Sequence, residues 1–305
     1  MNNIYLNIYK HNFINLKKAK KNLENNNVIG IPTETVYGLA GNAYSNKSVK
    51  KIFKLKKRSS INPLIIHYEK LENVKNDAIF NNSLLKLYKA FCPGPITFIL
   101  KKRSQSKISK VATVGKKTVA IRFPKHKVAQ NILKITNNPL AAPSANISTR
   151  LSSTCAKDVY DEFGKKIKVI LDGGKSKIGL ESTIIDLTGK PSILRPGKIT
   201  KEKIEKVLKR KIIIKKKFKE INAPGQLKLH YSPGIPIYIN KKKCPKDCAF
   251  ITFGKKYPVT RNSFNLSRKS NLNEAAKNLY RFFRNIKNEG YKKIYVVEIP
   301  NKGIG

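Results

Sequence analysis

The chain has 305 residues, and its 64 Lys and Arg against 18 Asp and Glu give a formal net charge of +46. That length exceeds what one hydrophobic core usually organises, and a hydrophobic fraction of 40% with 13 Tyr and 13 Phe excludes a disordered chain. The charge favours anionic partners and leaves two interpretations open: a nucleic-acid surface, or lysine enrichment along the whole chain combined with small anionic ligands. Any non-specific RNA contact should weaken steeply as salt rises.

Helices and strands alternate along the first two hundred or so residues. Apolar residues at helical spacing predict helices, and short β-branched or aromatic runs predict strands. The predicted helices are 14–23, 48–55, 83–91, 128–135, 154–163 and 201–208. The predicted strands are 28–31, 64–67, 97–100, 118–123, 140–142, 169–171, 183–187 and 193–194. This intermixed order is typical of an α/β domain built on one large sheet.

The composition changes after residue 210. A basic run at 211–219 leads to Ala223-Pro224-Gly225, which cannot lie inside a helix or a central strand. A second, small α/β unit that docks on the first domain follows. Its predicted elements are strands 237–239, 249–253 and 294–299 and a helix at 273–287. We therefore expect a first domain at 1–212, a linker at 213–235 and a second domain at 236–305.

The sequence contains no pattern that indicates export or a membrane anchor. Residues 1–10 lack a secretory signal pattern, and no run approaches the roughly 20 apolar residues that span a bilayer. We therefore expect a cytoplasmic protein without membrane contact. The cysteines Cys92, Cys155, Cys244 and Cys248 do not indicate a disulfide framework. Cys244 and Cys248 have no second Cys or His pair nearby, which favours two reduced thiols in a loop over a zinc site.

The familiar nucleotide-binding signatures are absent. Gly173-Gly174-Lys175-Ser176 resembles the end of a P-loop, but Val169 stands where the first glycine is required. A nucleotide would therefore bind through dispersed side chains and turn amides. Lys56 and Arg58 lie at the end of the helix predicted at 48–55, so both can reach one ligand. The planar fork of Arg58 suits phosphate or carboxylate.

A set of motifs then follows in a fixed order over the first domain. They are Pro32-Thr33-Glu34-Thr35-Val36-Tyr37-Gly38-Leu39-Ala40-Gly41, Lys56-x-Arg58 with Asn62-Pro63-Leu64, Cys92-Pro93-Gly94-Pro95-Ile96-Thr97, Val119-Ala120-Ile121-Arg122-Phe123-Pro124, Ala142-Pro143-Ser144-Ala145-Asn146, Leu171-Asp172-Gly173-Gly174, Glu181-Ser182-Thr183 and Leu194-Arg195-Pro196-Gly197. In this order they resemble the Sua/YciO/YrdC family. Ala223-Pro224-Gly225-x4-His230-Tyr231-Ser232-Pro233 resembles the linker of its two-domain, Sua-type members.

The resemblance implies both a fold and an activity. The fold is α/β: a YrdC-like large twisted mixed sheet with flanking helices, and a small C-terminal Rossmann-like α/β domain joined by a long linker. Sua-type proteins usually continue through a further helix, so we expect the second domain, which stops at 305, to be shortened or incomplete. The activity is that of an L-threonylcarbamoyladenylate synthase, a nucleotidyltransferase. It joins L-threonine, bicarbonate and ATP into threonylcarbamoyl-AMP and pyrophosphate, the first step of threonylcarbamoyladenosine (t6A) modification of tRNA, before a separate transferase acts.

The resemblance also implies which residues bind each substrate. The residues expected around L-threonine are Thr35, His67, Arg122, Ala142 and Ser182. The residues expected to hold ATP are Arg58, Asn62, Thr118, Ser144, Ser152, Arg195 and Tyr231, with the adjacent Ser153 as the alternative to Ser152. The catalytic cluster around bicarbonate and phosphate is expected to be Lys56, Arg58, Ser144 and Asn146.

Two electrostatic expectations accompany this site. Arg122 follows Ile121 on an apolar strand, where an unpaired charge would be costly, and the chain has few acidic residues. We therefore expect an external carboxylate, that of L-threonine, as its partner. No dedicated carboxylate pair is present, so Mg²⁺ is expected to be held by ATP phosphates and water. Glu34 is then either an outer-sphere contact of that ion or a charge at a helix N-terminus.

The linker and the charge give the remaining hypotheses. Residues 223–233 contain two prolines, and we expect them to close over the ATP site and exclude water from the labile product. The main alternative is a non-catalytic RNA-binding protein that uses a YrdC-like basic concave surface. A second alternative, a carbamoyl-adenylate step in hydrogenase maturation, is disfavoured because the zinc-finger and acylphosphatase segments of those larger proteins are missing.

Overall fold

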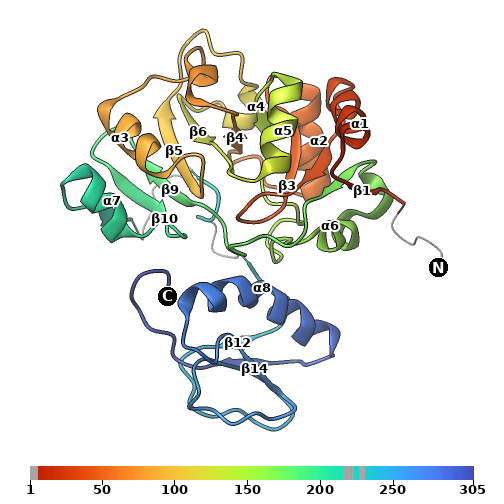
Figure 1. Ribbon diagram of the computed structural model, residues 1–305, viewed down its shortest axis with the longest axis vertical. Coiled ribbons are helices and arrows are strands. Elements are labelled where there is room, and N and C mark those ends of the chain that lie inside the picture. The colour runs from red at the N-terminus through yellow and green to blue at the C-terminus, as the bar shows by residue number, and fades with distance from the viewer. Residues whose placement is uncertain (1–5, 216–220, 222, 227–230) are drawn as a thin grey trace.

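In the computed structural model the chain forms a large α/β domain and a small one (Figure 1). The structure describes residues 6–215, 221, 223–226 and 231–305. The strands of the large domain are β1 (Ile8–Lys10), β2 (Ile29–Ile31), β3 (Gly38–Asn42), β4 (Ile65–His67), β5 (Ile96–Lys101), β6 (Thr118–Arg122), β7 (Leu140–Ala141), β8 (Ile170–Asp172), β9 (Thr183–Asp186), β10 (Ser192–Arg195) and β11 (Ile213–Ile214). Its helices are α1 (Phe13–Glu24), α2 (Asn46–Lys56), α3 (Asn82–Phe91), α4 (Lys110–Thr113), α5 (Lys127–Thr136), α6 (Ala156–Phe163) and α7 (Lys201–Leu208), with 3-10 turns at Leu71–Val74 and Gly164–Lys166.

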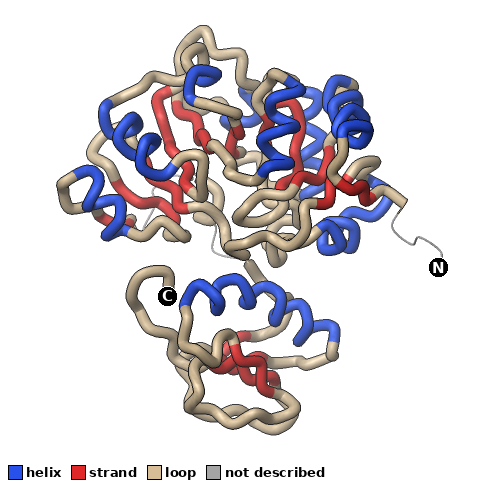
Figure 2. Tube along the Cα trace, in the orientation of Figure 1, coloured by secondary structure: helices blue, strands red, loops and turns tan. Residues whose placement is uncertain are grey.

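These strands form one 11-stranded mixed sheet in the order β1-β8-β2-β3-β7-β4-β6-β5-β9-β10-β11. The centre of the sheet joins β4 to β6 in parallel and β6 to β5 in antiparallel fashion. Helices flank the sheet, as the tube view in Figure 2 shows. The register sets His67 beside Arg122 and Arg122 beside Thr97, so three polar side chains meet across neighbouring strands.

The two faces of this sheet are covered differently. One face packs on α2, α3, α6 and α7 in the largest apolar cluster. On the other face α1 and α5 cover only the part around β2, β7 and β8. The remaining part of that face carries a small apolar cluster on β4, β5, β6, β9 and β10, which is completed by Ala223 of the linker rather than by a helix. A stretch of sheet therefore lies open for a site.

The small domain contains a four-stranded sheet and one long helix. The strands β12 (Ile237–Tyr238), β13 (Ala249–Thr252), β14 (Ser263–Asn265) and β15 (Ile294–Val296) are all parallel, in the order β12-β15-β13-β14. Helix α8 (Leu272–Asn288) lies on the side of this sheet that faces the large domain (Figure 1). Its apolar core also includes Val36 and Leu151 of the large domain, so the two domains share one cluster.

The predicted fold class is confirmed, with a large mixed sheet, flanking helices and a small α/β domain. Every helix and strand predicted above appears within a few residues of its expected bounds. The strands β1, β3, β11 and β14 and the short helix α4 were missed. The division at 1–212, 213–235 and 236–305 stays a prediction, although β11 pairs with β10 and so belongs to the first sheet.

Candidate active site

A cavity lies on the open part of the sheet, under the linker. It is lined by Thr33, Val36, Tyr37, Gly38, Arg58, Ile65, His67, Arg122, Ala142, Pro143, Ser144, Glu181, Ser182, Arg195, Pro224 and Tyr231. Its free volume is about 40 Å³, which is room for a few water molecules. A nucleotide can therefore enter only if some of the covering residues move. Three guanidinium groups from distant parts of the chain meet here, those of Arg58, Arg122 and Arg195, together with the carboxylate of Glu181.

One side of the cavity, which we call the sheet half, is lined by His67 and Arg122 and includes Glu34 as the partner of Arg122. His67 ends β4 and Arg122 ends β6, and residues two apart on a strand share a face, so both point to the same side as Ile65 and Ala120. The Nη2 of Arg122 donates to the Oε1 of Glu34 at 2.8 Å, and both side chains are almost fully buried. The other carboxylate oxygen of Glu34 accepts from the backbone N–H of Lys125 at 3.0 Å.

This ion pair corrects two expectations. Arg122 does not depend on an external carboxylate, because Glu34 already neutralises it inside the domain. Glu34 is not at a helix N-terminus either, since the chain bends at residues 34–36 and then enters β3. The Nε of Arg122 is buried and has no hydrogen-bond partner in the described part of the chain. A ligand oxygen at that position would satisfy it.

His67 is buried in the same half, next to Arg122. Burial, and then the charge of Arg122, lower the pKa of His67 well below its usual value, so the imidazole is neutral at physiological pH. Its Nδ1 has no partner among the residues that the structure describes. A neutral ring with an unused nitrogen can accept or donate one hydrogen bond to a ligand in the cavity.

The opposite side, the loop half, is formed by Arg58, Ser182, Arg195 and Tyr231. Arg58 follows the left-handed Lys57 that ends α2. Its Nε donates to the carbonyl of Asn62 at 2.9 Å, and its Nη2 donates to the Asn62 amide oxygen at 2.6 Å and to the Pro63 carbonyl at 2.9 Å. Burial lowers the pKa of Arg58, and the guanidinium stays charged at neutral pH. Asn62 therefore holds Arg58 instead of lining the cavity.

Arg195 ends β10 and is held by the segment beside it. Its Nε and Nη2 donate to the carbonyl of Ser182 at 3.1 and 2.9 Å, and Nη2 also lies 3.1 Å from the Ser182 hydroxyl. The same hydroxyl bonds Thr97 on β5 at 2.7 Å. The Nη1 of Arg195 donates to the Tyr231 hydroxyl at 3.4 Å. Arg195 therefore ties the sheet to the linker.

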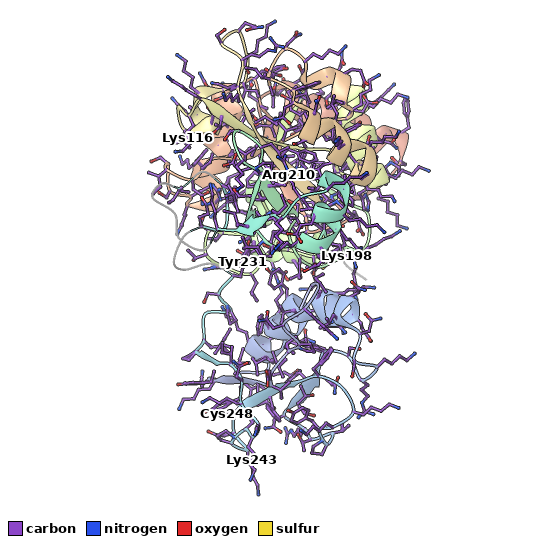
Figure 3. The ribbon with its side chains drawn as sticks, turned by 90° about the vertical axis from the view of Figure 1, so that its left-hand side faces the viewer. Lys116, Lys198, Arg210, Tyr231, Lys243 and Cys248 are labelled. Atoms are coloured by element: carbon purple, nitrogen blue, oxygen red, sulfur yellow. The ribbon has the colours of Figure 1, made fainter. Side chains whose placement is uncertain are left out.

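The linker covers the loop half at close range. Gly225 has φ +94°, and a Cβ built there would lie 2.9 Å from the Cδ of Arg195, so only glycine fits. The backbone N–H of Ser232 donates to the carbonyl of Thr149 at 2.8 Å. Figure 3 shows Tyr231 at the junction of the two domains. His230 of the predicted motif lies outside the described residues.

Two predicted catalytic residues lie behind the cavity wall rather than on it. Lys56 is fully buried, and its Nζ donates to the carbonyls of Ser144 and Asn146 at 2.5 Å each. Burial, and then the charge of Arg58, lower the pKa of Lys56 well below its usual value. The side-chain amide of Asn146 donates to the carbonyls of Ile147 and Arg150 at 2.8 Å. Both residues hold the loop that presents Ser144 and neither lines the cavity, and their expected place around bicarbonate stays a prediction.

The remaining predicted residues divide between cavity and surroundings. Ala142 and Ser144 line it. Thr35 is buried beside it, with its hydroxyl 2.8 Å from that of Thr33. Ser152 bonds the carboxylate of Glu181, whereas Ser153 bonds the Ala145 carbonyl. Thr118 begins β6, four residues from Arg122 and so about 13 Å away along the strand; it does not line the cavity.

Several cavity residues were not predicted. They are Thr33, Val36, Tyr37, Gly38, Ile65, Pro143, Glu181 and Pro224. Glu181 precedes Ser182 in the motif Glu181-Ser182-Thr183, so its position next to a predicted site residue could have indicated that it lines the cavity. Ile65 could be found from strand alternation, since it shares a face with His67. Thr33, Val36, Tyr37 and Gly38 lie within the motif at 32–41, and Pro143 lies within that at 142–146, so membership of a motif was a signal for them as well.

The described residues contain no group of three or more His, Cys, Asp or Glu side chains that could hold a metal ion. In the cavity, Glu34 is engaged by Arg122 and Lys125, and Glu181 accepts from Ser152 and Tyr280. Cys244 and Cys248 are free thiols, and Figure 3 places Cys248 in the part of the small domain far from the junction. No helix of the described chain is both long and apolar enough to cross a bilayer.

Two family models cover nearly the whole chain. The Sua5/YciO/YrdC model, described as telomere recombination, matches residues 21–197. A second model, described as the C-terminal domain of threonylcarbamoyl-AMP synthase, matches residues 199–305. The chain belongs to the Sua5/YciO/YrdC family. The second match adds the C-terminal domain of the synthases, as the linker motif predicts.

Named relatives and a solved structure agree with this placement. A threonylcarbamoyl-AMP synthase of Pyrococcus abyssi is 36% identical over 91% of this chain and 87% of its own length. A Bacillus subtilis protein of the same name is 40% identical over 73% of this chain and 66% of its own length. The crystal structure of P. abyssi Sua5 complexed with L-threonine has a TM-score of 0.88 at 32% identity, over 97% of this chain and 93% of that one. The predicted family and YrdC-like fold are confirmed.

Proposed function

We propose that this protein synthesises L-threonylcarbamoyl-AMP and pyrophosphate from L-threonine, bicarbonate and ATP, the first step of tRNA threonylcarbamoyladenosine modification. The observation that carries the proposal is the convergence of Arg58, Arg122 and Arg195 on one cavity. The names of the family's synthases, and a relative solved with L-threonine, support it. Because the pathway uses ATP and tRNA, we propose that the protein acts in the cytoplasm.

The reaction needs this charge because it joins two anions. The neutral amine of threonine attacks CO₂ with loss of a proton, or attacks bicarbonate with loss of water, and a carbamate forms. A carbamate oxygen then attacks the α-phosphorus of ATP, and the bond to pyrophosphate breaks. Fixed cations in a dry cavity lower the cost of this encounter, and positioning contributes at least as much as proton transfer.

We assign L-threonine to the sheet half. Its carboxylate would take the unused Nε of Arg122, and its hydroxyl or amine would bond the neutral ring of His67. Ala142 lies along the same cavity, and Thr35 supports its wall. Ser182, which was expected around L-threonine, lies in the loop half, where it holds Arg195. Because Glu34 has already neutralised Arg122, the substrate carboxylate gains a directed hydrogen bond more than a new ion pair.

We assign ATP to the loop half. Arg58, Ser144 and Arg195 line it, Asn62 fixes Arg58, and Tyr231 lies over it. Ser152 acts on this half through Glu181. In this assignment Lys56 and Asn146 are positioning residues for the Ser144 loop, and Thr118 has no contact in the cavity. Mg²⁺, if ATP brings it, would be held by phosphate oxygens and water, with its charge offsetting that of the triphosphate.

The linker serves as a lid in this proposal. Pro224, Gly225 and Tyr231 close the loop half so tightly that only about 40 Å³ remains. Nucleotide entry therefore needs the lid to open, and closure would exclude water from the labile mixed anhydride. A downstream threonylcarbamoyl transferase must then accept that product before it hydrolyses.

The direct test supplies labelled bicarbonate, L-threonine and Mg-ATP and looks for threonylcarbamoyl-AMP with an equal amount of pyrophosphate. Omission of each substrate in turn should abolish the product. Salt-sensitive RNA binding without any conversion of ATP to pyrophosphate would overturn the proposal and select the non-catalytic RNA-binding alternative. The +46 charge makes that outcome worth measuring in the same samples.

A further inference from the structure

Helix α8 of the small domain reaches the large domain with two side chains on one face. Tyr280 and Arg284 are four residues apart, so they lie one above the other on the helix. The Tyr280 hydroxyl donates to the Oε2 of Glu181 at 3.0 Å. The Nη2 of Arg284 donates to the carbonyls of Leu151 and Ser152 at 3.0 Å each. Helix α8 therefore contacts Glu181, which lines the cavity, and Ser152, which bonds Glu181.

Glu181 is a buried carboxylate shared by the two domains. One oxygen accepts from the Ser152 hydroxyl of the large domain, and the other accepts from Tyr280 of the small one. A buried carboxylate is costly unless donors satisfy it. The next residue, Ser182, supplies the carbonyl that holds Arg195. The Tyr280 hydroxyl therefore fixes Glu181, and Glu181 is next in sequence to Ser182, whose carbonyl holds Arg195.

The ring of Tyr280 makes a second contact with the site. It is stacked on the ring of Tyr231, with centroids 5.9 Å apart and planes 26° apart. Tyr231 has φ +57°, a backbone conformation that L-residues adopt only when their surroundings impose it. The Tyr231 hydroxyl in turn accepts from Arg195. One side chain of α8 thus contacts both the lid and the carboxylate beneath it.

We propose that Tyr280 is a positioning residue for the loop half: its ring holds Tyr231 of the lid, and its hydroxyl holds Glu181. The inference rests on the proposed function for the identity of the ligand, ATP. The sheet half is built by β4, β6 and Glu34 within the large domain. Tyr280 should therefore influence nucleotide affinity and leave L-threonine affinity alone, a separation that a purely structural role would not produce.

Two substitutions separate the ring from the hydroxyl. Tyr280→Phe keeps the stacked ring and loses the hydrogen bond to Glu181, and Tyr280→Leu loses both. The probes are L-threonine and α,β-methylene-ATP, an analogue whose α–β bridge cannot be cleaved, each titrated calorimetrically into the full chain. We expect the dissociation constant for the ATP analogue to rise about threefold to tenfold in Tyr280→Phe and about tenfold to a hundredfold in Tyr280→Leu. The L-threonine constant should stay within about twofold of wild type in both.

The matched control lies two residues along the same helix. Phe282 packs edge-on against Phe264 of β14 inside the small domain. Phe282→Leu should lower the melting temperature without changing either affinity. The proposal is overturned if Tyr280→Leu binds both probes as wild type does, if it weakens both equally, or if Phe282→Leu reproduces its effect. These are binding measurements, so their outcome is independent of turnover. A wild-type protein that makes no threonylcarbamoyl-AMP would contradict the proposed function, and the selective effect of Tyr280 on ATP-analogue affinity could still be observed.

Discussion

The two halves of the cavity are built in different ways. In the sheet half, His67 and Arg122 sit side by side on hydrogen-bonded strands, and their partner Glu34 lies in the same domain. In the loop half, Arg58 and Arg195 are held by side-chain bonds to Asn62 and Ser182 and by the linker. Strand register fixes the first set without help, whereas the second set depends on segments that must come together. Changes in the linker or the small domain should therefore affect one half only.

The largest expected effect comes from breaking the sheet half. Arg122→Ala leaves the carboxylate of Glu34 buried without its cation, which should lower the free energy of unfolding by about 3–5 kcal/mol. Urea denaturation measures this loss. The double variant Glu34→Gln with Arg122→Met removes both charges and should recover most of the stability. An Arg122→Ala protein as stable as wild type would show that the ion pair does not organise this half.

A smaller effect is expected from the lid that closes the loop half. In Gly225→Ala, the new Cβ meets the Cδ of Arg195 and the backbone is held at φ +94°. Such strain costs about 1–3 kcal/mol, so the closed lid should be destabilised and the KM for ATP should rise, with the KM for L-threonine unchanged. The control is Gly189→Ala, where a Cβ meets no atom within 4 Å. Equal rises in both KM values would argue against a lid on one half.

The smallest effect is a pH dependence from the sheet half. Burial holds the pKa of His67 in the folded protein well below its value in the unfolded chain. Below about pH 6.5 the imidazole is therefore protonated in the unfolded chain but not in the folded protein. Stability from this group is complete above that pH and is lost as pH falls, by up to about 1.4 kcal/mol per pH unit. His67→Gln should flatten the stability profile between pH 7 and 5. An unchanged profile would mean that the pKa of His67 is the same in the folded and the unfolded chain.

Strand patterns predicted most of the sheet, because runs rich in β-branched and apolar residues, such as Thr118 to Arg122, favour a buried β-strand. The missed strands lacked that signal. In β3, Gly38 and Gly41 resemble a turn, yet Gly41 is required because a Cβ there would clash with Ser48. The strands β1 and β11 are short edge strands, which tertiary pairing creates rather than local propensity.

The site was predictable mainly through the resemblance of its motifs to a known family. Local patterns singled out Arg58 at a helix end and Arg122 on an apolar strand, whereas Arg195 was assigned to the site by the resemblance alone, and the structure brings all three to one cavity. The partner of Arg122 was not predictable, since only the bend at residues 34–36 brings Glu34 across the sheet. The contact of Tyr280 with Glu181 joins residues 99 apart in sequence, and no local pattern records it.

The central claim is that the two halves of one cavity bind different substrates, and a charge-conserving pair of variants tests it most directly. Arg122→Lys and Arg195→Lys each keep the positive charge and lose the planar fork. Calorimetric titration of both proteins with L-threonine and with α,β-methylene-ATP gives four dissociation constants. We expect Arg122→Lys to weaken L-threonine about tenfold or more and Arg195→Lys to weaken the ATP analogue similarly, each leaving the other ligand almost unchanged. Losses of the same size for both ligands in both variants would contradict the account.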